Sequence, residues 1–315
     1  MGVRAAGIDY EIVDRPATLP QSFGTAPGTR LEFLAITAID GSRVDAALWQ
    51  RQDCVPAETT LVIHIHGSGS NYAKPPNAAV GAGLAATGRA VLAINTRQHD
   101  DRVATDNFFD IRRDIEAAVY TGRALGFRRL VLQGHSLGSV QVLFYAAANW
   151  DDDIKAVALL AMFGNLAWKT RTILVHDEER FKALSESAMA ALRAGRESEF
   201  LSLPMGWFTD ASMPVTAQHF LTYRREESSA ADSTYWIRRV KLPILMVRSE
   251  ADALIQPFEP YMLLSAAHAE GSLVADIRYV LLPDQRRPSL EGHGFVGAEA
   301  ALIATLGGWL DTLAL

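Results

Sequence analysis

The chain has 315 residues, of which 49% are hydrophobic and 21% are charged, so it can bury a large core and lacks the composition of a disordered chain. Its net charge of −6 offers no basic surface for nucleic acid, and the single cysteine, Cys54, excludes an internal disulfide and a multi-cysteine metal site. Residues 1–20 lack the apolar core of a signal peptide and no apolar run is long enough for a membrane helix, so we expect a cytoplasmic protein that binds neither membrane nor nucleic acid.

In chain order, residues 1–30 hold several Pro and Gly and little periodicity, which predicts an irregular lead-in. Two strand-like runs then follow, Leu31–Ile39 and Arg43–Arg51, separated by the dipeptide Asp40-Gly41. Because Asp-Gly between two such runs is a strong turn signal, we expect a β-hairpin here.

From residue 60 onward, short apolar runs alternate with helix-like stretches. The predicted strands are Thr60–His66, Ala90–Asn95, Arg129–Gln133, Ile154–Ala161, Leu242–Arg248 and Arg278–Leu282. The predicted helices are 75–87, Phe108–Leu125, Leu137–Ala148 and Ala298–Leu313. This alternation indicates right-handed β-α-β crossovers, and therefore an α/β fold with a mostly parallel central sheet covered by helices on both faces.

The alternation stops between residues 164 and 240, where the sequence shows no convincing strand and many aromatic residues. Helical stretches are expected at Asp177–Ala194 and Val215–Ser228. We interpret 164–240 as a helical lid over the active edge of the sheet, with residues 1–163 and 241–315 as the core domain. A plain helical layer of the core is the alternative.

The pentapeptide Gly134-His135-Ser136-Leu137-Gly138 fits the pattern G-x-S-x-G and lies between a predicted strand and a predicted helix. A sharp turn at this point strains the backbone of the serine, and a Cβ on either flanking residue would collide with neighbouring chain. The turn exposes the hydroxyl and directs helix N–H groups at a reacting carbonyl. Ser136 is therefore the predicted nucleophile.

A serine hydroxyl needs a neighbouring base to accept its proton. His293 is the candidate, because Gly292 and Gly294 flank it in an expected loop between the last strand and the final helix. Six other histidines are expected to be core, turn, surface or lid residues: His64, His66, His135, His176, His219 and His268.

The imidazole in turn needs an acid that fixes its tautomer and stabilises its protonated form. Asp252 follows the strand Leu242–Arg248 almost directly, and Glu250 is its nearest rival. The order Ser136, Asp252, His293 along the chain is that of an α/β-hydrolase triad.

The negative charge that develops on the substrate oxygen needs preorganised donors. One should be the backbone N–H of Leu137, directly after the nucleophile. The other should come from the loop after the first central strand, where the N–H of Ser68 or Gly69 is the candidate, and the sequence does not separate the two. This loop lacks the spacing of a phosphate-binding loop, so nucleotide binding is not expected.

Taken together, the hairpin, the His66-Gly67 loop, the Gly134–Gly138 turn, the Asp252 turn and the His293 loop resemble the α/β-hydrolase superfamily from about residue 31 to the C-terminus. The resemblance implies the α/β-hydrolase fold, with a helical lid inserted before the strand that carries the acid. Branches with Asp or Cys at the turn, namely haloalkane dehalogenases, epoxide hydrolases and dienelactone hydrolases, differ from this chain. Serine esterases, lactonases, thioesterases and carbon–carbon bond hydrolases remain.

These residues predict a serine hydrolase that cleaves a carboxylic ester, lactone or thioester through an acyl-enzyme, and that loses activity in acid as its histidine protonates. Two alternatives use the same triad: a carbon–carbon bond hydrolase and a cofactor-free lyase. A third, of a different class, is a receptor-like ligand-binding protein on the same fold. No cofactor or metal is expected, and the sequence leaves the oligomeric state open.

The aromatic residues of the insertion predict a small-molecule substrate with an apolar or aromatic group. The candidates for substrate binding are Trp168, Trp207, Phe208, Tyr223 and Trp236. For any single one of these aromatic residues, packing against the body of the protein is at least as good an explanation as substrate binding. Arg97 could bind a substrate carboxylate, although an ion pair that braces its loop is the better interpretation.

Overall fold

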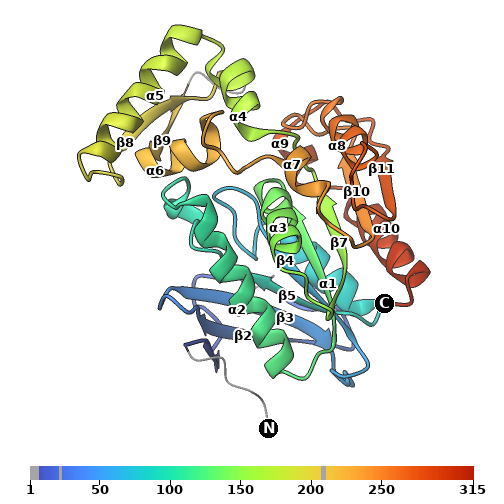
Figure 1. The fold of residues 1–315 in the computed structure, drawn as a ribbon. Coiled ribbons are helices and arrows are strands. Elements are labelled where there is room, and N and C mark those ends of the chain that lie inside the picture. Colours follow the sequence, from blue (N-terminus) through green and yellow to red (C-terminus); the bar gives the residue numbers. More distant parts are fainter. Residues whose placement is uncertain (1–6, 21–22, 207–210) are drawn as a thin grey trace.

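The computed structural model describes residues 7–20, 23–206 and 211–315. Within these ranges nine strands form one sheet in the order β1-β2-β3-β5-β4-β6-β7-β10-β11, with helices packed on both faces (Figure 1). The strands from β5 to β11 in this order are parallel, whereas β1, β2 and β3 pair antiparallel. The mostly parallel α/β architecture predicted from the sequence is confirmed.

The elements of the body follow the predicted order closely. The strands are β1 (Asp9–Val13), β2 (Thr29–Thr37), β3 (Arg43–Arg51), β4 (Thr60–Ile65), β5 (Ala90–Ile94), β6 (Arg129–His135), β7 (Ile154–Leu160), β10 (Ile244–Ser249) and β11 (Ile277–Leu282). The helices are α1 (Asn77–Ala86), α2 (Ile111–Ala124), α3 (Leu137–Ala148), α8 (Glu259–Ala267), α9 (Leu290–His293) and α10 (Glu299–Thr312), with short 3₁₀ turns η1 (Asp100–Arg102) and η2 (Phe108–Asp110).

The central strands are buried along their whole length. Every residue of β4 and of β5 is buried, since helices cover both faces of the sheet at this point. This burial explains why the sequence shows continuous apolar runs here rather than an alternation of apolar and polar residues. The Asp40-Gly41 hairpin is also confirmed, because β2 and β3 pair from Thr29–Arg51 to Thr37–Arg43.

Several elements of the body were not expected from the sequence, among them strand β1 and helix α8. Strand β1 pairs with β2 inside the stretch predicted to be irregular, so that prediction is wrong for Asp9–Val13. The strand is short, three of its five residues are exposed, and it carries Asp9 and Glu11. Its pairing therefore depends on the edge that β2 offers rather than on its own pattern. Helix α8 follows the acid's turn and begins with Glu259-Pro260.

The insertion between β7 and β10 is not purely helical. Its elements are α4 (Leu166–Lys169), the π-helix η3 (Thr170–Val175), α5 (Glu178–Arg193), β8 (Phe200–Pro204), β9 (Ser212–Thr216), α6 (Ala217–His219), the π-helix η4 (Phe220–Arg224) and α7 (Ser233–Ile237). The expectation of no strand is corrected by β8 and β9, which pair with each other as an antiparallel ribbon. Pro204 and Pro214 argued against strands in the sequence. Proline is tolerated here because both strands of a two-stranded ribbon have a free edge.

The insertion lies beyond the end of the sheet to which the β7 arrow points in Figure 1. It has a small apolar cluster of its own, built around Phe181, Leu203, Val215 and Phe220. Backbone hydrogen bonds also join it to the body, such as the one from Thr216 N to Ala104 O. Among the described residues, no helix combines the length and apolarity needed to cross a membrane.

Candidate functional site

The turn between β6 and α3 places Ser136 in a strained conformation. Its backbone has φ of +53° and ψ of −118°, in a region that non-glycine residues rarely occupy. A Cβ on Gly134 would lie 2.2 Å from Gly138 O, and a Cβ on Gly138 would lie 2.3 Å from Ile65 O. The two glycines are therefore required for the close approach of backbone that holds the serine, whose side chain remains partly exposed.

His293 and Asp252 form a hydrogen-bonded pair. His293 Nδ1 lies 3.0 Å from both carboxylate oxygens of Asp252, and both side chains are buried. His293 ends the short helix α9 rather than lying in a loop, and Ser289 caps this helix by accepting from Gly292 N. A Cβ on Gly292 would meet Ala251 O at 1.9 Å, so this glycine lets α9 lie against the acid's turn.

The environment of Asp252 keeps its carboxylate ionised. Burial alone would raise the pKa of this carboxyl. The neighbouring His293 and the N–H groups of Leu254 and Ile255, which donate to Oδ1, outweigh burial and lower the pKa below its ordinary value. The rival Glu250 is exposed and its carboxylate accepts from Asp284 N, so the structure brings Asp252 and not Glu250 to His293.

His135 links the serine turn to the histidine. Its Nε2 lies 2.9 Å from His293 O, and the two imidazole rings are 4.9 Å apart. Burial, and then the neighbouring His293, lower the pKa of His135 to about 3, so this ring is neutral at physiological pH. Because His135 directly precedes Ser136, this contact fixes the nucleophile's turn relative to α9.

The loop after β4 closes the site from the other side. A Cβ on Gly67 would lie 2.9 Å from Ser136 Cβ, so this loop passes directly against Ser136. Gly67 O accepts from Ser70 N at 3.1 Å, which closes a turn with Ser68 exposed and Gly69 at φ of +60°. Leu137 is the first residue of α3, so its N–H has no partner within the helix.

Two buried histidines hold this loop. His66 Nδ1 lies 2.7 Å from Gly67 O, and its Nε2 accepts from Thr96 N at 3.0 Å. His64 lies between Asn77 and Gln133. Burial lowers the pKa of each histidine to about 4, so both are neutral at physiological pH and brace the loop, as expected from the sequence.

Two buried cationic side chains hold the turn that carries Asp252. The sequence analysis did not identify either of them. Lys169 of α4 donates to Leu254 O at 2.6 Å and to Glu259 Oε1 at 2.5 Å, and Glu259 accepts in turn from Gln256 N. Arg248, at the end of β10, donates to the carbonyls of Asp252 and Ile255. The insertion thereby contacts the turn next to Asp252. No short motif signals either residue, since Lys169 and Glu259 are 90 positions apart.

The aromatic candidates have different surroundings. Trp168 is partly buried, and its ring meets Phe258 edge-to-face at 5.8 Å, near the acid's turn. Tyr223 is fully buried and donates to Asp106, and Trp236 packs its ring 5.0 Å from Phe144 of α3. The remaining two, Trp207 and Phe208, lie outside the described residues. The substrate-binding assignment stays a prediction.

Arg97 forms ion pairs that brace its loop, which is the interpretation that the sequence favoured. Its guanidinium donates to Asp114 at 2.6 and 3.0 Å and to Asp40 at 3.1 Å, which ties the loop after β5 to α2 and to the β2–β3 turn. The side chain is therefore committed to two carboxylates.

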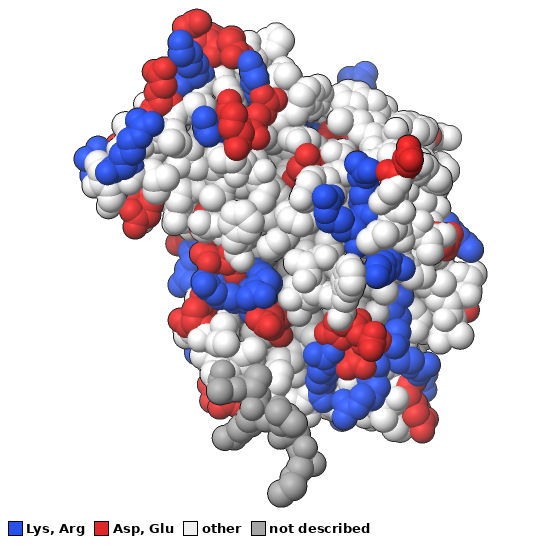
Figure 2. Space-filling view, in the orientation of Figure 1, with Lys and Arg blue, Asp and Glu red and all other residues white. Residues whose placement is uncertain are grey.

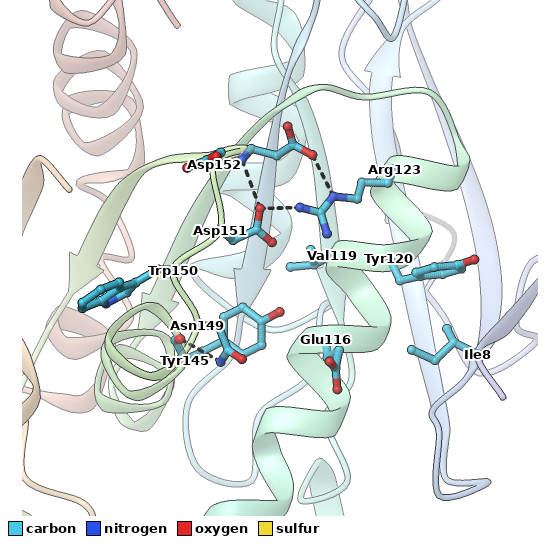
Figure 3. A pocket seen from close by; sticks show the side chains of 11 residues that line it. Ile8, Glu116, Val119, Tyr120, Arg123, Tyr145, Asn149, Trp150, Asp151 and Asp152 are labelled. Carbon is cyan, nitrogen blue, oxygen red and sulfur yellow. Dashed lines mark hydrogen bonds and ion pairs between the residues drawn. The ribbon is translucent and has the colours of Figure 1, made fainter. Parts of the chain in front are cut away.

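A separate surface cavity of about 510 Å³ lies between the C-terminal parts of α2 and α3 (Figure 3). Arg123 pairs there with Asp151 and Asp153, and Tyr120, Tyr145 and Trp150 line its walls. Because α2 and α3 begin at the active end of the sheet, this cavity lies at its opposite end. On the face in Figure 2, acidic and basic side chains adjoin one another, and no broad area carries only one sign. No group of potential metal ligands occurs among the described residues.

Comparisons with known proteins agree with this geometry. A family model described as alpha/beta hydrolase fold matches residues 60–265. Among solved structures, the ferulic acid complex of Est1E from Butyrivibrio proteoclasticus is similar, with 18% identity, a TM-score of 0.64 and coverage of 88% of this chain and 98% of that one. The esterase domain of a Rhodothermus marinus protein is also similar, with 19% identity, a TM-score of 0.59 and coverage of 89% and 98%.

A third similar structure is the siderophore hydrolase EstB from Aspergillus fumigatus, with 15% identity, a TM-score of 0.59 and coverage of 86% of this chain and 94% of that one. At these identities the likeness concerns the fold. No curated protein matches the sequence of this chain significantly.

Proposed function

The chain belongs to the α/β-hydrolase fold family, and from that premise we propose that it is a serine hydrolase that cleaves carboxylic esters through an acyl-enzyme on Ser136. One observation carries the proposal: Ser136 occupies a strained turn whose neighbour His135 is bonded to His293, and His293 is bonded to the ionised Asp252. Lactones and thioesters undergo the same chemistry and fall within the proposal.

In the proposed first step, His293 accepts the Ser136 proton while the hydroxyl oxygen attacks the ester carbonyl. Asp252 holds the imidazole through Nδ1 and stabilises its protonated form. His293 then gives the proton to the departing alcohol, and the acyl group stays on Ser136. In the second step His293 takes a proton from the water that attacks the acyl carbonyl. The bond to Ser136 Oγ then breaks, His293 returns the proton to this oxygen, and the acid leaves.

The developing oxyanion would be stabilised by backbone donors at the turn and at the loop after β4. The free first N–H of α3, from Leu137, is one. The close approach of Gly67 to Ser136 supports a second donor from the next residues of the same loop. The N–H of Ser68 or of Gly69 would be this second donor.

We further propose that residues 164–240 act as a lid. Its helix α4 is attached to the acid's turn through Lys169, and its helix α7 packs on the nucleophile's helix through Trp236 and Phe144. The insertion therefore contacts both the turn of Asp252 and the helix that follows Ser136. These two contacts support a role in shaping the substrate pocket.

The test is hydrolysis of p-nitrophenyl esters of increasing acyl length, measured for the wild type beside Ser136→Ala. We expect turnover by the wild type and a loss of about 10³-fold or more in the variant. Turnover that persists in Ser136→Ala, with contaminating esterase excluded by a vector-only preparation, would show that another group is the nucleophile.

A further inference from the structure

Arg224, the last residue of the π-helix η4, carries a buried and unpaired charge. The residue is only 5% exposed. Its one hydrogen bond runs from Nη1 to the hydroxyl of Thr170 at 3.3 Å, and its buried Nε has no partner among the described residues. No carboxylate of the described residues lies within ion-pair distance of its guanidinium.

This arrangement is costly for the free protein. Burial lowers the pKa of Arg224 to about 10, which still leaves the guanidinium protonated at physiological pH. An isolated buried charge is strongly unfavourable unless it is paired or fully hydrogen-bonded. A trapped water could accept a hydrogen bond from Nε, but it would not neutralise the charge. A guanidinium in these surroundings is therefore suited to bind an anion.

Two further buried polar atoms around Tyr223, the residue before Arg224, also lack partners among the described residues. They are Gln141 Oε1 and His219 Nε2. Gln141 Nε2 lies 3.5 Å from the Tyr223 hydroxyl, and the His219 ring stacks on Tyr223 at 4.0 Å. Burial lowers the pKa of the His219 imidazole, and the charge of Arg224 also acts to lower it.

The position of Arg224 connects it to the catalytic residues. Thr170, which it contacts, directly follows Lys169, whose ammonium holds the turn of Asp252. Gln141 lies five residues after Ser136 on α3, which corresponds to roughly 7–8 Å along the helix axis. Thr170 therefore links Arg224 to Lys169 and so to the turn of Asp252. The neighbouring Tyr223 contacts Gln141 on the helix that begins directly after Ser136.

We propose that Arg224 binds a carboxylate carried by the substrate, so that the preferred substrates are esters with a second, ionised carboxyl group. This inference rests on the proposed esterase function. The planar guanidinium suits the two oxygens of a carboxylate, and its Nε, which has no partner among the described residues, is available to donate. Arg97, the other candidate for this role in the sequence, is already occupied by Asp40 and Asp114.

The activity test compares matched esters. One series holds the monoethyl esters of dicarboxylic acids from succinate to suberate. The other holds the neutral ethyl esters of matching acyl length, from butyrate to octanoate. The rate of acid release is measured at constant pH. The wild type should prefer one or more of the anionic esters through a lower KM. Arg224→Met should lose about 30-fold or more of kcat/KM on those esters and little on the neutral ones. Arg225→Met, which removes the neighbouring arginine paired with Glu227, is the matched control and should keep the preference.

A binding test separates this inference from the esterase proposal. Calorimetric titration of the free dicarboxylates into the Ser136→Ala protein should show binding that Arg224→Met abolishes and Arg225→Met retains. If esters are hydrolysed but anionic and neutral ones are treated alike, and no dicarboxylate binds, the carboxylate site is refuted while the esterase stands. If dicarboxylates bind through Arg224 but no ester is hydrolysed, the esterase proposal fails and the site stands. Should Arg224→Met fold poorly, Arg224→Lys keeps the charge, and it should retain weakened binding.

Discussion

In the body, the buried carboxylate of Asp114 is held by Arg97, whereas in the insertion the buried guanidinium of Arg224 makes a single hydrogen bond within the described residues, to the hydroxyl of Thr170. The carboxylate of Asp252 is likewise fully hydrogen-bonded, to His293 and to two backbone N–H groups. The charges of the body are thus bonded before any substrate arrives, and that of Arg224 is not. In our proposal the body holds preorganised catalytic groups, and the insertion is completed by its ligand.

The largest effect is expected from a change in the body's preorganised pair. Asp252→Asn removes the charge that stabilises the protonated His293 and disturbs its tautomer, so kcat should fall by about 10³-fold or more. Glu250→Gln, two residues away and exposed, is the control and should leave kcat near the wild-type value. Similar losses in both variants would mean that the acid has been assigned to the wrong residue.

The contrast between the two buried arginines predicts stability changes of opposite sign. Arg97→Met leaves Asp114 buried without its partner, and burial already raises the pKa of that carboxyl despite Arg97, so a loss of about 3–5 kcal/mol in the free energy of unfolding is expected. Arg224→Met removes an unpaired buried charge and should raise the midpoint of thermal unfolding. Denaturant titration and thermal unfolding of the two variants measure this, and destabilisation by Arg224→Met would remove the basis of the contrast.

Lys169 joins the two regions, so its loss should affect the site through the acid's turn. Lys169→Met frees Leu254 O and leaves Glu259 buried and unpaired, and kcat should fall roughly 10-fold as Asp252 loses its fixed position. Adding Glu259→Gln removes the orphaned charge and should recover stability more than kcat. Equal recovery of both would assign Lys169 a purely structural role.

The smallest expected effect is the pH dependence of stability from Asp252. Its pKa is lower in the folded protein than its ordinary value, so its contribution is fully present above the pKa of the unfolded chain, about 4. That contribution is lost only as the pH falls through the lower, folded pKa. The wild type should therefore lose more stability than Asp252→Asn between about pH 5 and about pH 2. Parallel stability curves for the two proteins would contradict the lowered pKa.

The sequence predicted those parts of the molecule whose signal is local. The turn around Ser136 depends on Gly134 and Gly138, each two positions from the serine, and the clash distances show why those positions carry glycine. The buried strands β4 and β5 were equally visible, since each is a continuous apolar run. The Asp40-Gly41 turn identified the hairpin of β2 and β3 for the same reason.

The parts that the sequence did not reveal depend on distant partners. Strand β1 exists because β2 offers an edge, and β8 and β9 stabilise only each other. The bond between Lys169 and Glu259 joins two segments that no periodicity relates. Arg224 stands in the sequence beside Arg225 and looks the same, and only the fold buries one and pairs the other with Glu227.

The most direct test of the central claim is to label the protein with a fluorophosphonate and locate the adduct by mass spectrometry of the intact chain and its peptides. A single adduct on Ser136 is expected, absent from Ser136→Ala and greatly slowed in Asp252→Asn. Labelling at another residue, or no labelling of a preparation that hydrolyses esters, would contradict the assignment of Ser136, His293 and Asp252 as one catalytic unit.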